Sequence, residues 1–280
     1  MRTALSTLFA VLATASLAPA QESFEPKVEK GDKWTVRSES SLTLNLKVTS
    51  IEGGAPGETR ERQLKTKRTE VKELEFTDVE KGLPVGWKAT FTEAKVRTGG
   101  ANATDAELEV ATAEVEGKTY FVSGSEVTPE DTPADIKGGL REPESFYLLL
   151  PKDKKSLNDS WEVSAAKVSK LVVRGAWEDP SDDSKVRVTL SEIVNQDGSS
   201  IAVLALTGSI KADSKQGFQV EFEFTGSLRY DLTNQRPLSL EVSGEAKSLV
   251  GKIVDAHGQE VGHVDAQGSA FRLEVFYSPK

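Results

Sequence analysis

The chain has 280 residues, a formal net charge of −9 and no cysteine. The lack of cysteine excludes disulfides, thiol catalysis, cysteine-ligated zinc and an anchor on a lipidated cysteine. Because no cluster of Lys and Arg stands out from the acidic background, we expect neither a nucleic acid nor an anionic membrane surface as a partner.

Residues 1–20 have the pattern of a secretory signal peptide. Arg2 precedes an apolar run from Leu5 to Ala18, and the small residues Ala18 and Ala20 fit the site that a signal peptidase reads. The run is short for a membrane span, and no later apolar stretch approaches the roughly 20 residues that a spanning helix needs. We therefore expect export to the periplasm or the extracellular space, with no transmembrane span in the mature chain.

A tryptophan motif then appears twice. The stretches KGDKWTV (Lys30–Val36) and LNDSWEV (Leu157–Val163) share the pattern [GN]-D-[KS]-W-[TE]-V. In each, we expect an Asp-containing turn to lead into a strand that Trp34 or Trp161 anchors to its sheet, since large aromatic side chains most often pack in cores. A paired aromatic platform for a ligand is the functional alternative.

The strands that follow each motif also correspond. The run Leu74–Val96 overlays Val188–Ile210 without a gap, so that Leu74 matches Val188, and the first copy carries an additional basic insertion at Gly53–Arg68. Self-similarity of this kind predicts two similar units in tandem. The predicted division is a first β unit at 21–126, a Pro-rich connection at 127–156 and a second β unit at 157–280.

The connection interrupts the strand pattern. Thr128-Pro129 followed by two acidic residues has the form of a helix N-cap and first turn. Pro133, Pro143 and the pair Gly138-Gly139 limit any helix here to one or two turns. Phe146–Leu150 is a short apolar plug, which we expect to dock onto one of the sheet units.

Alternation of apolar and polar residues predicts strands throughout both units. In Phe218–Asp231, apolar residues or glycine hold the even positions and polar residues hold the odd positions. Strand side chains point alternately to opposite faces, so one face is buried and the other is wet. The same period recurs in Leu42–Thr49, Leu238–Ser243 and Phe271–Tyr277, and no segment after residue 20 shows a helical stripe of helix length.

Tight turns separate these strands. The pair Asp197-Gly198 suits a type I′ hairpin, in which both central residues need a positive φ. Connections this short leave no room for helical crossovers. The prediction is an all-β fold of two similar antiparallel curved-sheet units, half-barrel or sandwich-like, joined by a short helical or irregular connection.

This combination resembles a loose group of exported bacterial β proteins. The shared features are the signal peptide, the Trp-led β units, a junction from Leu150-Pro151 to Trp161, and a run such as PLSLEVSG at Pro237–Gly244. The units are similar in turn to the curved, incompletely closed sheets of lipoprotein carriers of the LolA/LolB type. That resemblance implies a concave apolar face that holds acyl chains, and it carries over no catalytic residues.

One histidine pair offers candidate metal ligands. His257 and His263, together with Asp255 and Asp265, form the pattern D-x-H-x5-H-x-D with four N and O ligands. A five-residue loop after His257 would bring all four to one face, whereas a two-residue turn would place His263 opposite Lys252 and scatter them. Tight hairpins are the commoner connection, so a solvent-exposed polar hairpin without a metal is the favoured interpretation.

Other catalytic or ligand-binding patterns are sparse. The acidic loop WEDPSDDSK (Trp177–Lys185) lacks the regular ligand spacing of a calcium loop, and a solvated turn is the favoured interpretation. No nucleophile elbow, zinc-binding helix motif, phosphate-binding loop or dinucleotide fingerprint occurs. We expect no catalytic residue and no cofactor, and we favour a protein without enzyme activity.

Two functions remain as hypotheses. The protein binds or carries an apolar ligand or lipid on a curved sheet, or it is a structural or protein-interaction module whose partner is another envelope protein. A metal-dependent enzyme at the histidine hairpin is a third hypothesis. The deciding observation is whether the even-numbered face of Phe218–Tyr230 meets a filled core or an open pocket.

Overall fold

The computed structural model describes residues 21–52, 54–100, 102–132, 134–140, 146–172, 180–213, 218–255, 257, 259–266 and 268–280. The predicted signal peptide at 1–20 lies outside these residues. The strands are β1 (Lys33–Glu52), β2 (Ala55–Glu80), β3 (Leu83–Gly99), β4 (Glu109–Thr112), β5 (Thr119–Ser123), β6 (Glu126–Thr128), β7 (Ser160–Val163), β8 (Lys185–Gln196), β9 (Ser199–Asp213), β10 (Phe218–Asp231), β11 (Arg236–Val254), β12 (Glu260–Ala266) and β13 (Ser269–Pro279). The helices are α1 (Ala134–Leu140) and α3 (Ala165–Val172).

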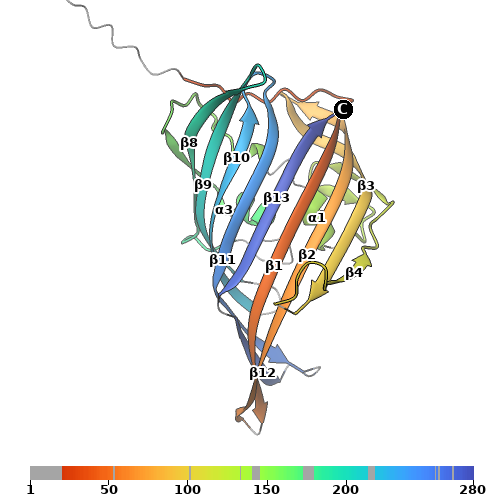
Figure 1. Cartoon of the computed structure of the whole chain (residues 1–280), viewed down its shortest axis with the longest axis vertical. Helices are drawn as coiled ribbons and strands as arrows, with labels where there is room; N and C mark the ends of the chain where they lie inside the picture. The colour runs from red at the N-terminus through yellow and green to blue at the C-terminus, as the bar shows by residue number, and fades with distance from the viewer. Residues whose placement is uncertain are drawn as a thin grey trace, which may run out of the picture.

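The strands pair into a single antiparallel sheet of 13 strands (Figure 1). Its order is β6-β5-β3-β2-β1-β12-β11-β10-β9-β8-β7. In the upper part of Figure 1, β13 lies between β1 and β11, and below it β12 takes the same place. The prediction of an all-β, antiparallel curved fold is confirmed, and strands from both expected units contribute to the same sheet.

One face of the sheet is apolar and faces inward. The register between β1 and β2 is unbroken over Lys33–Thr49, so the even-numbered residues of both strands share this face. In β10, the even-numbered side chains from Val220 to Tyr230 are buried, and the one even position without a side chain, Gly226, is half-buried. The predicted alternation in β10 is confirmed, and we call this side of the sheet the inner face.

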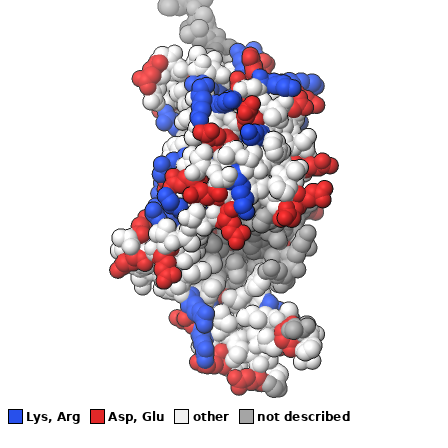
Figure 2. All heavy atoms as spheres, turned by 90° about the vertical axis from the view of Figure 1, so that its right-hand side faces the viewer, with Lys and Arg blue, Asp and Glu red and all other residues white. Residues whose placement is uncertain are grey.

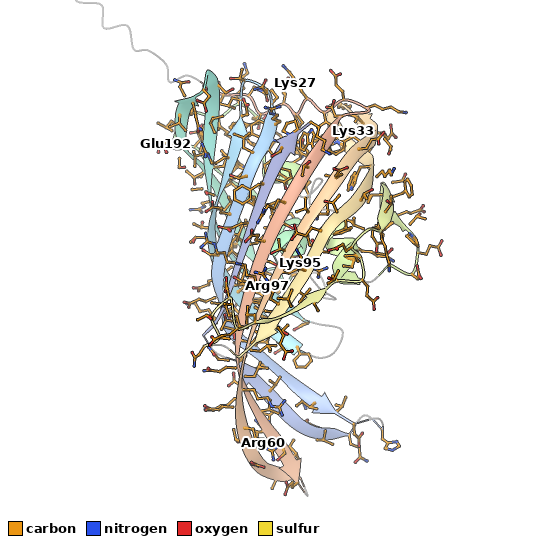
Figure 3. All side chains as sticks on the ribbon, turned by 45° about the vertical axis from the view of Figure 1, so that its right-hand side comes forward. Lys27, Lys33, Arg60, Lys95, Arg97 and Glu192 are labelled. Carbon is orange, nitrogen blue, oxygen red and sulfur yellow. The ribbon has the colours of Figure 1, made fainter. Side chains whose placement is uncertain are left out.

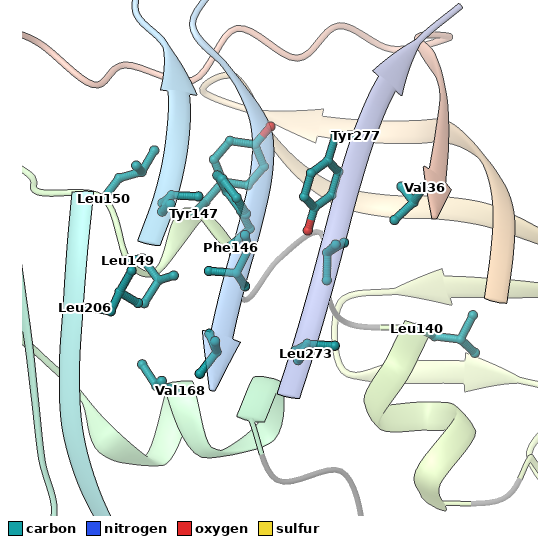
Figure 4. Close-up of a cluster of buried hydrophobic side chains, with 14 of the residues drawn as sticks. Val36, Leu140, Phe146, Tyr147, Leu149, Leu150, Val168, Leu206, Leu273 and Tyr277 are labelled. Atoms are coloured by element: carbon teal, nitrogen blue, oxygen red, sulfur yellow. The ribbon is translucent and has the colours of Figure 1, made fainter. Parts of the chain in front are cut away.

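The connection between the two expected units fills the upper half of the inner face (Figure 4). Phe146 and Leu149 are fully buried, and the ring of Phe146 lies 5.2 Å from that of Tyr277 in β13, in an edge-on arrangement. Leu140 of α1 and Val168 of α3 belong to the same buried cluster. The predicted apolar plug is confirmed, and the upper inner face meets a filled core.

Two indole N–H groups hold the connection against the sheet. Trp87 Nε1 donates a hydrogen bond to the carbonyl oxygen of Leu140 at 3.1 Å, and Trp161 Nε1 donates to that of Leu149 at 3.0 Å. A buried carbonyl without a partner would be costly, so these bonds specify how the connection docks. Trp34 is buried and packs edge-on against Phe76, with 5.1 Å between ring centres. Core packing therefore explains the tryptophans that lead both motifs.

The turns before these tryptophans have the same geometry. Gly31 and Asn158 both have a positive φ, of 94° and 71°. The carboxylates of Asp32 and Asp159 each accept a hydrogen bond from the backbone N–H three residues earlier, at 2.9 and 2.8 Å. An Asp side chain that binds its own turn in this way favours the turn over continued strand. The sequence pattern correctly predicts both turns.

The strand pairs that start at the two turns also match. Trp34 of β1 lies opposite Leu74 of β2, and Trp161 of β7 lies opposite Val188 of β8. Leu74 and Val188 are the two residues that the sequence overlay brings together. The basic insertion that separates the two overlays belongs to the hairpin formed by β1 and β2, which makes the narrow lower end of the molecule in Figure 1.

The helices differ from the sequence-based expectation. The pattern places a helix N-cap at Thr128, but Thr128 is the last residue of β6 and α1 begins at Ala134. Val127 pairs with Val122 and is buried, so the short hairpin of β5 and β6 overrides the local N-cap signal. Helix α3 is not anticipated by the sequence pattern because eight residues are too few to show a clear helical stripe.

Candidate ligand-binding site

Below the filled core, the inner face of β1 stays apolar but is only half-buried. Leu42, Leu44, Leu46 and Val48 of β1 all point to this face, because they continue the even parity of the buried residue Val36. Their side chains are of intermediate exposure, and they lie outside the described buried cluster. We call this row and its apolar neighbours the lower apolar face.

Neighbouring strands extend the lower apolar face sideways. Leu44 lies opposite Leu64 of β2, which is 40% exposed. On the other side, Ala266 and Val264 of β12 lie opposite Leu46 and Val48. Cross-strand pairs on one face are in direct reach of one another. The face therefore runs from Leu64 across β1 to β12, and two arginines of β2, Arg62 and Arg60, border it opposite Leu46 and Val48.

An aromatic contact joins the lower apolar face to the core. Leu42 lies opposite Phe271 of β13, and the ring of Phe271 packs edge-on against Phe222 of β10 with 5.4 Å between centres. Phe222 is buried and Phe271 is half-buried. The transition from filled core to half-open face therefore occurs at this contact.

A cluster of charged side chains lies on the same face of β2, between the lower apolar face and the filled core. Glu70 and Lys72 are each 2% exposed, and Arg68 is 19% exposed. Arg68 Nε is 2.5 Å from a carboxylate oxygen of Glu70, and Lys72 Nζ is 3.8 Å from the other oxygen. Lys72 Nζ also donates to the carbonyl oxygen of Gly139 at 2.9 Å and lies 5.6 Å from the ring centre of Phe91.

Buried charges need partners because removing them from water is costly. The cluster meets this need with its internal ion pairs and with a backbone carbonyl of α1. Sequence reasoning missed it, although a signal exists: Glu70 and Lys72 share the even parity of the buried residues Leu74 and Phe76. A charged residue at a core-facing position of a strand is the pattern that would have revealed the cluster.

The outer face of the sheet is polar and its charges are mixed. Figure 2 shows basic and acidic side chains interspersed on the visible face. Lys67 and Lys65 bind Asp105 at 3.0 and 3.1 Å, and the pKa of that carboxyl is lowered first by the Lys67 hydrogen bond. Lys95 and Arg97 lie midway along the molecule, whereas Arg60, which lies opposite Val48 and so on the inner face, marks the narrow lower end (Figure 3). Such a face favours water over an apolar ligand.

Two grooves on the outer face are lined by both charged and apolar groups. One, of about 570 Å³, lies over β7 to β11 around Arg187, Thr207 and Thr225. The other, of about 600 Å³, lies over β10 to β12 around Lys252 and His263. Charged side chains interrupt the apolar lining of both grooves, so neither offers an apolar row as continuous as Leu42–Val48.

The two candidate ligands of β12 are placed by the strand register. His263 lies opposite Lys252 of β11, as the tight-turn alternative predicts. Asp265 lies two residues further along β12, opposite Val250. The arrangement that would bring His257 and His263 together as a cross-strand pair is therefore not formed.

The other two candidate ligands, Asp255 and His257, lie just after β11 and are hydrogen-bonded to each other there. The carboxylate of Asp255 accepts hydrogen bonds from the backbone N–H groups of His257 and Gln259, at 2.8 and 2.9 Å. In the predicted acidic loop, Asp182 and Asp183 are exposed, and residues 178 and 179 lie outside the described residues. Within the described ranges, no group of three or more His, Asp or Glu side chains is placed to hold a metal ion.

No family model and no curated protein matches the chain significantly. Among solved structures, the chain is similar to lipovitellin, from a study of its lipid–protein interactions, at a TM-score of 0.44 and 9% identity. The match covers 90% of this chain but 25% of that one, so the chain spans a quarter of lipovitellin.

Other similar structures include an outer membrane channel and OmpF. An outer membrane channel from Pseudomonas putida F1 has a TM-score of 0.24 at 7% identity, with 91% of this chain and 98% of that one covered. OmpF of Salmonella typhi in complex with daunomycin has a TM-score of 0.21 at 8% identity, with 89% and 98% covered. Likenesses this slight carry no functional argument. No helix among the described residues is long and apolar enough to cross a bilayer.

Proposed function

We propose that the protein is an exported, non-enzymatic β protein that binds an apolar ligand or lipid on its lower apolar face. The observation that carries this proposal is the row from Leu42 to Val48, which continues the core-facing parity of β1 yet is only half-buried. At roughly 3.3 Å per residue, this row is about 20 Å long, which suits a long acyl chain lying along the strand.

The physical reason lies in the hydrophobic effect. Apolar surface is favourably removed from water, and soluble proteins seldom leave a contiguous apolar face uncovered unless it binds something. Here the face is continuous with the core through Phe271 and Phe222, so a bound chain would extend the core downward. An acyl chain needs no polar partner along its length, which matches the apolar pairs of Leu44 with Leu64 and of Leu46 with Ala266.

Export and duplication belong to the same proposal. The pattern of residues 1–20 supports export through a signal peptide. The matching turns at Asp32 and Asp159, with the equivalent pairs that follow them, support a tandem repeat of one β unit. In this proposal, the second unit supplies β13, β12 and β11, which border the ligand face on the side away from β2.

A binding assay with an uncharged, environment-sensitive fluorescent alkyl probe tests the proposal. We expect saturable binding with a blue-shifted emission, and about tenfold weaker binding for Leu44→Gln, since a buried leucine contributes roughly 1.5 kcal/mol or more. Thr43→Gln is the matched control, because Thr43 is the adjacent residue on the outer face of the same strand. Equal binding by both variants and the native protein, or no binding at all, would contradict the proposal.

The filled upper face favours a second candidate. Phe146, Leu149 and their neighbours occupy the place that a carrier would leave open. A structural or protein-interaction module of the cell envelope would use such a rigid, filled core. Native mass spectrometry of the purified protein separates the two: co-purified lipid supports the carrier, whereas a bare chain that crosslinks specifically to an envelope protein supports the module.

A further inference from the structure

We propose that the groove of about 570 Å³ on the outer face binds a short neutral oligosaccharide, which lies across the strands from β8 to β11. This groove is on the opposite side of the sheet from the lower apolar face. The inference therefore goes beyond the proposed function and does not depend on it.

The strand register explains the shape of the groove. Its floor is one row of paired residues whose side chains point to the inner face, namely Val186, Gly208, Phe224 and Gly244. The rows on either side point to the outer face, because successive side chains of a strand alternate, and these rows form the walls. Two residues along a strand span roughly 7 Å, and four neighbouring strands span roughly 14 Å. The groove is therefore long and narrow, and it runs across the strands.

One wall consists mainly of small side chains with hydroxyl groups. Thr207 lies opposite Thr225, and Thr225 lies opposite Ser243, so three hydroxyls stand side by side on neighbouring strands. Within the described part of the chain, none of the three is hydrogen-bonded to another protein group. The row ends at Arg187, which lies opposite Thr207. Since a hydroxyl both donates and accepts, this wall offers a ligand both kinds of hydrogen bond.

The charged groups around the groove balance one another. Three cationic and three anionic side chains line it: Lys185, Arg187, Lys247, Glu162, Glu223 and Glu245. Lys247 Nζ lies 3.2 Å from a carboxylate oxygen of Glu223 and 3.7 Å from one of Glu245. Glu162 lies opposite Arg187 in the strand register. With no net charge, the groove favours a neutral ligand that accepts hydrogen bonds from the cations and donates them to the carboxylates.

A sugar ring matches this combination. Its edge carries hydroxyls that donate and accept, and the C–H groups of its faces are apolar, so the ring can lie on the floor with its edge toward the walls. Ligand sites commonly have volumes of roughly 300–1,000 Å³, which leaves room here for a short oligosaccharide. The other outer groove lacks the hydroxyl row, because Thr49 is the one residue with a hydroxyl among its described lining residues.

Isothermal titration calorimetry with maltotriose, cellotriose, tri-N-acetylchitotriose and trigalacturonate tests the inference. We expect at least one of the neutral sugars to bind with a Kd below about 1 mM. Trigalacturonate should bind about tenfold more weakly than that sugar, because a charged sugar loses hydration with no net opposite charge to offset the loss.

Two variants locate the site. Thr225→Val removes the central hydroxyl but keeps a branched side chain, and it should weaken the binding of the neutral sugar about fivefold, as expected for one lost hydrogen bond. Thr35→Val is the matched control, because Thr35 lies on the outer face of β1 and does not line the groove. This variant should bind the sugar like the native protein.

Three results would overturn the inference. If no neutral sugar binds with a Kd below about 1 mM, the groove is not a saccharide site. If trigalacturonate binds as tightly as the best neutral sugar, the class of ligand is wrong. If Thr225→Val and Thr35→Val bind the sugar equally well, the sugar does not lie along the hydroxyl row. Both variants should keep their affinity for the alkyl probe, since neither residue belongs to the lower apolar face.

Discussion

At the scale of single residues, Tyr147 combines deep burial with a polar group. Its ring packs edge-on against Phe146, with 5.9 Å between centres, and its side chain is part of the plug that fills the upper inner face. Within the part of the chain that the structure describes, its hydroxyl has no hydrogen-bond partner. Burial raises the pKa of this hydroxyl well above its usual range, and burial likewise raises that of Tyr230.

Tyr147→Phe should therefore not destabilise the protein. Replacing a buried, unpaired hydroxyl by hydrogen removes a desolvation penalty, so we expect an unfolding free energy unchanged or raised by about 1 kcal/mol at pH 7. Urea titration followed by circular dichroism measures it. A loss of more than about 1 kcal/mol would show that the hydroxyl has a partner that matters.

The same substitution should alter the response to alkaline pH. The folded state holds the tyrosine protons more tightly than the unfolded state, whose tyrosine pKa is about 10. The contribution of the protonated tyrosine hydroxyls to stability is therefore complete below pH 10 and is lost as the pH rises through their raised folded-state pKa. In the same titrations repeated up to pH 11.5, the stability of Tyr147→Phe should fall less steeply than that of the native protein.

At the scale of elements, three glycines lie at neighbouring positions of β9, β10 and β11. A side chain on Gly226 or Gly244 would collide with the carbonyl oxygen of Glu241 or Glu223 on the paired strand, and one on Gly208 would collide with the ring of Phe224. Glycine inside a strand marks a bend or a close approach of two backbones. These residues allow the second half of the sheet to curve around its core.

Gly244→Ala should destabilise the protein by about 1–3 kcal/mol, because a carbonyl oxygen of a paired strand cannot move aside without disturbing the sheet. Gly100→Ala is the matched control: Gly100 lies just beyond β3, has no positive φ, and has no other atom within 4 Å of an added methyl group. Thermal unfolding of both variants measures the difference. Equal melting temperatures would show that the three strands tolerate the extra group.

At the scale of the whole molecule, local features were predictable from the sequence and long-range ones were not. The alternation in Phe218–Asp231 and the turn at Asp197-Gly198, where both residues have a positive φ, depend on neighbouring residues only. The row Leu42–Val48 was predictable as a strand face for the same reason. Its half-open state was not, since exposure depends on which distant segments cover it.

Which strands pair with one another could not be predicted from the sequence either. Alternation fixes which face of a strand is buried but not which strand lies beside it. The last strand, β13, pairs with the first, β1, over Trp34–Thr43, and also with β11. The parity of Glu70 and Lys72 was a sequence signal for the charged cluster, but the segment that covers it, which includes Gly139, could not be predicted because it is distant in the sequence.

This topology predicts that the two sequence-defined units unfold together. Because β13 pairs with β1 over Ala270–Pro279 and with β11 over Ser269–Phe276, we expect neither half to keep its sheet when the other melts. In a urea series with pulsed hydrogen exchange and mass spectrometry, peptides from β2 and β9 should lose protection at the same midpoint. A chain that ends at Gly268, and so lacks β13, should show no cooperative transition, whereas one that lacks only Lys280 should unfold like the native protein. Two separate midpoints in the native chain would instead indicate two domains that merely share an edge.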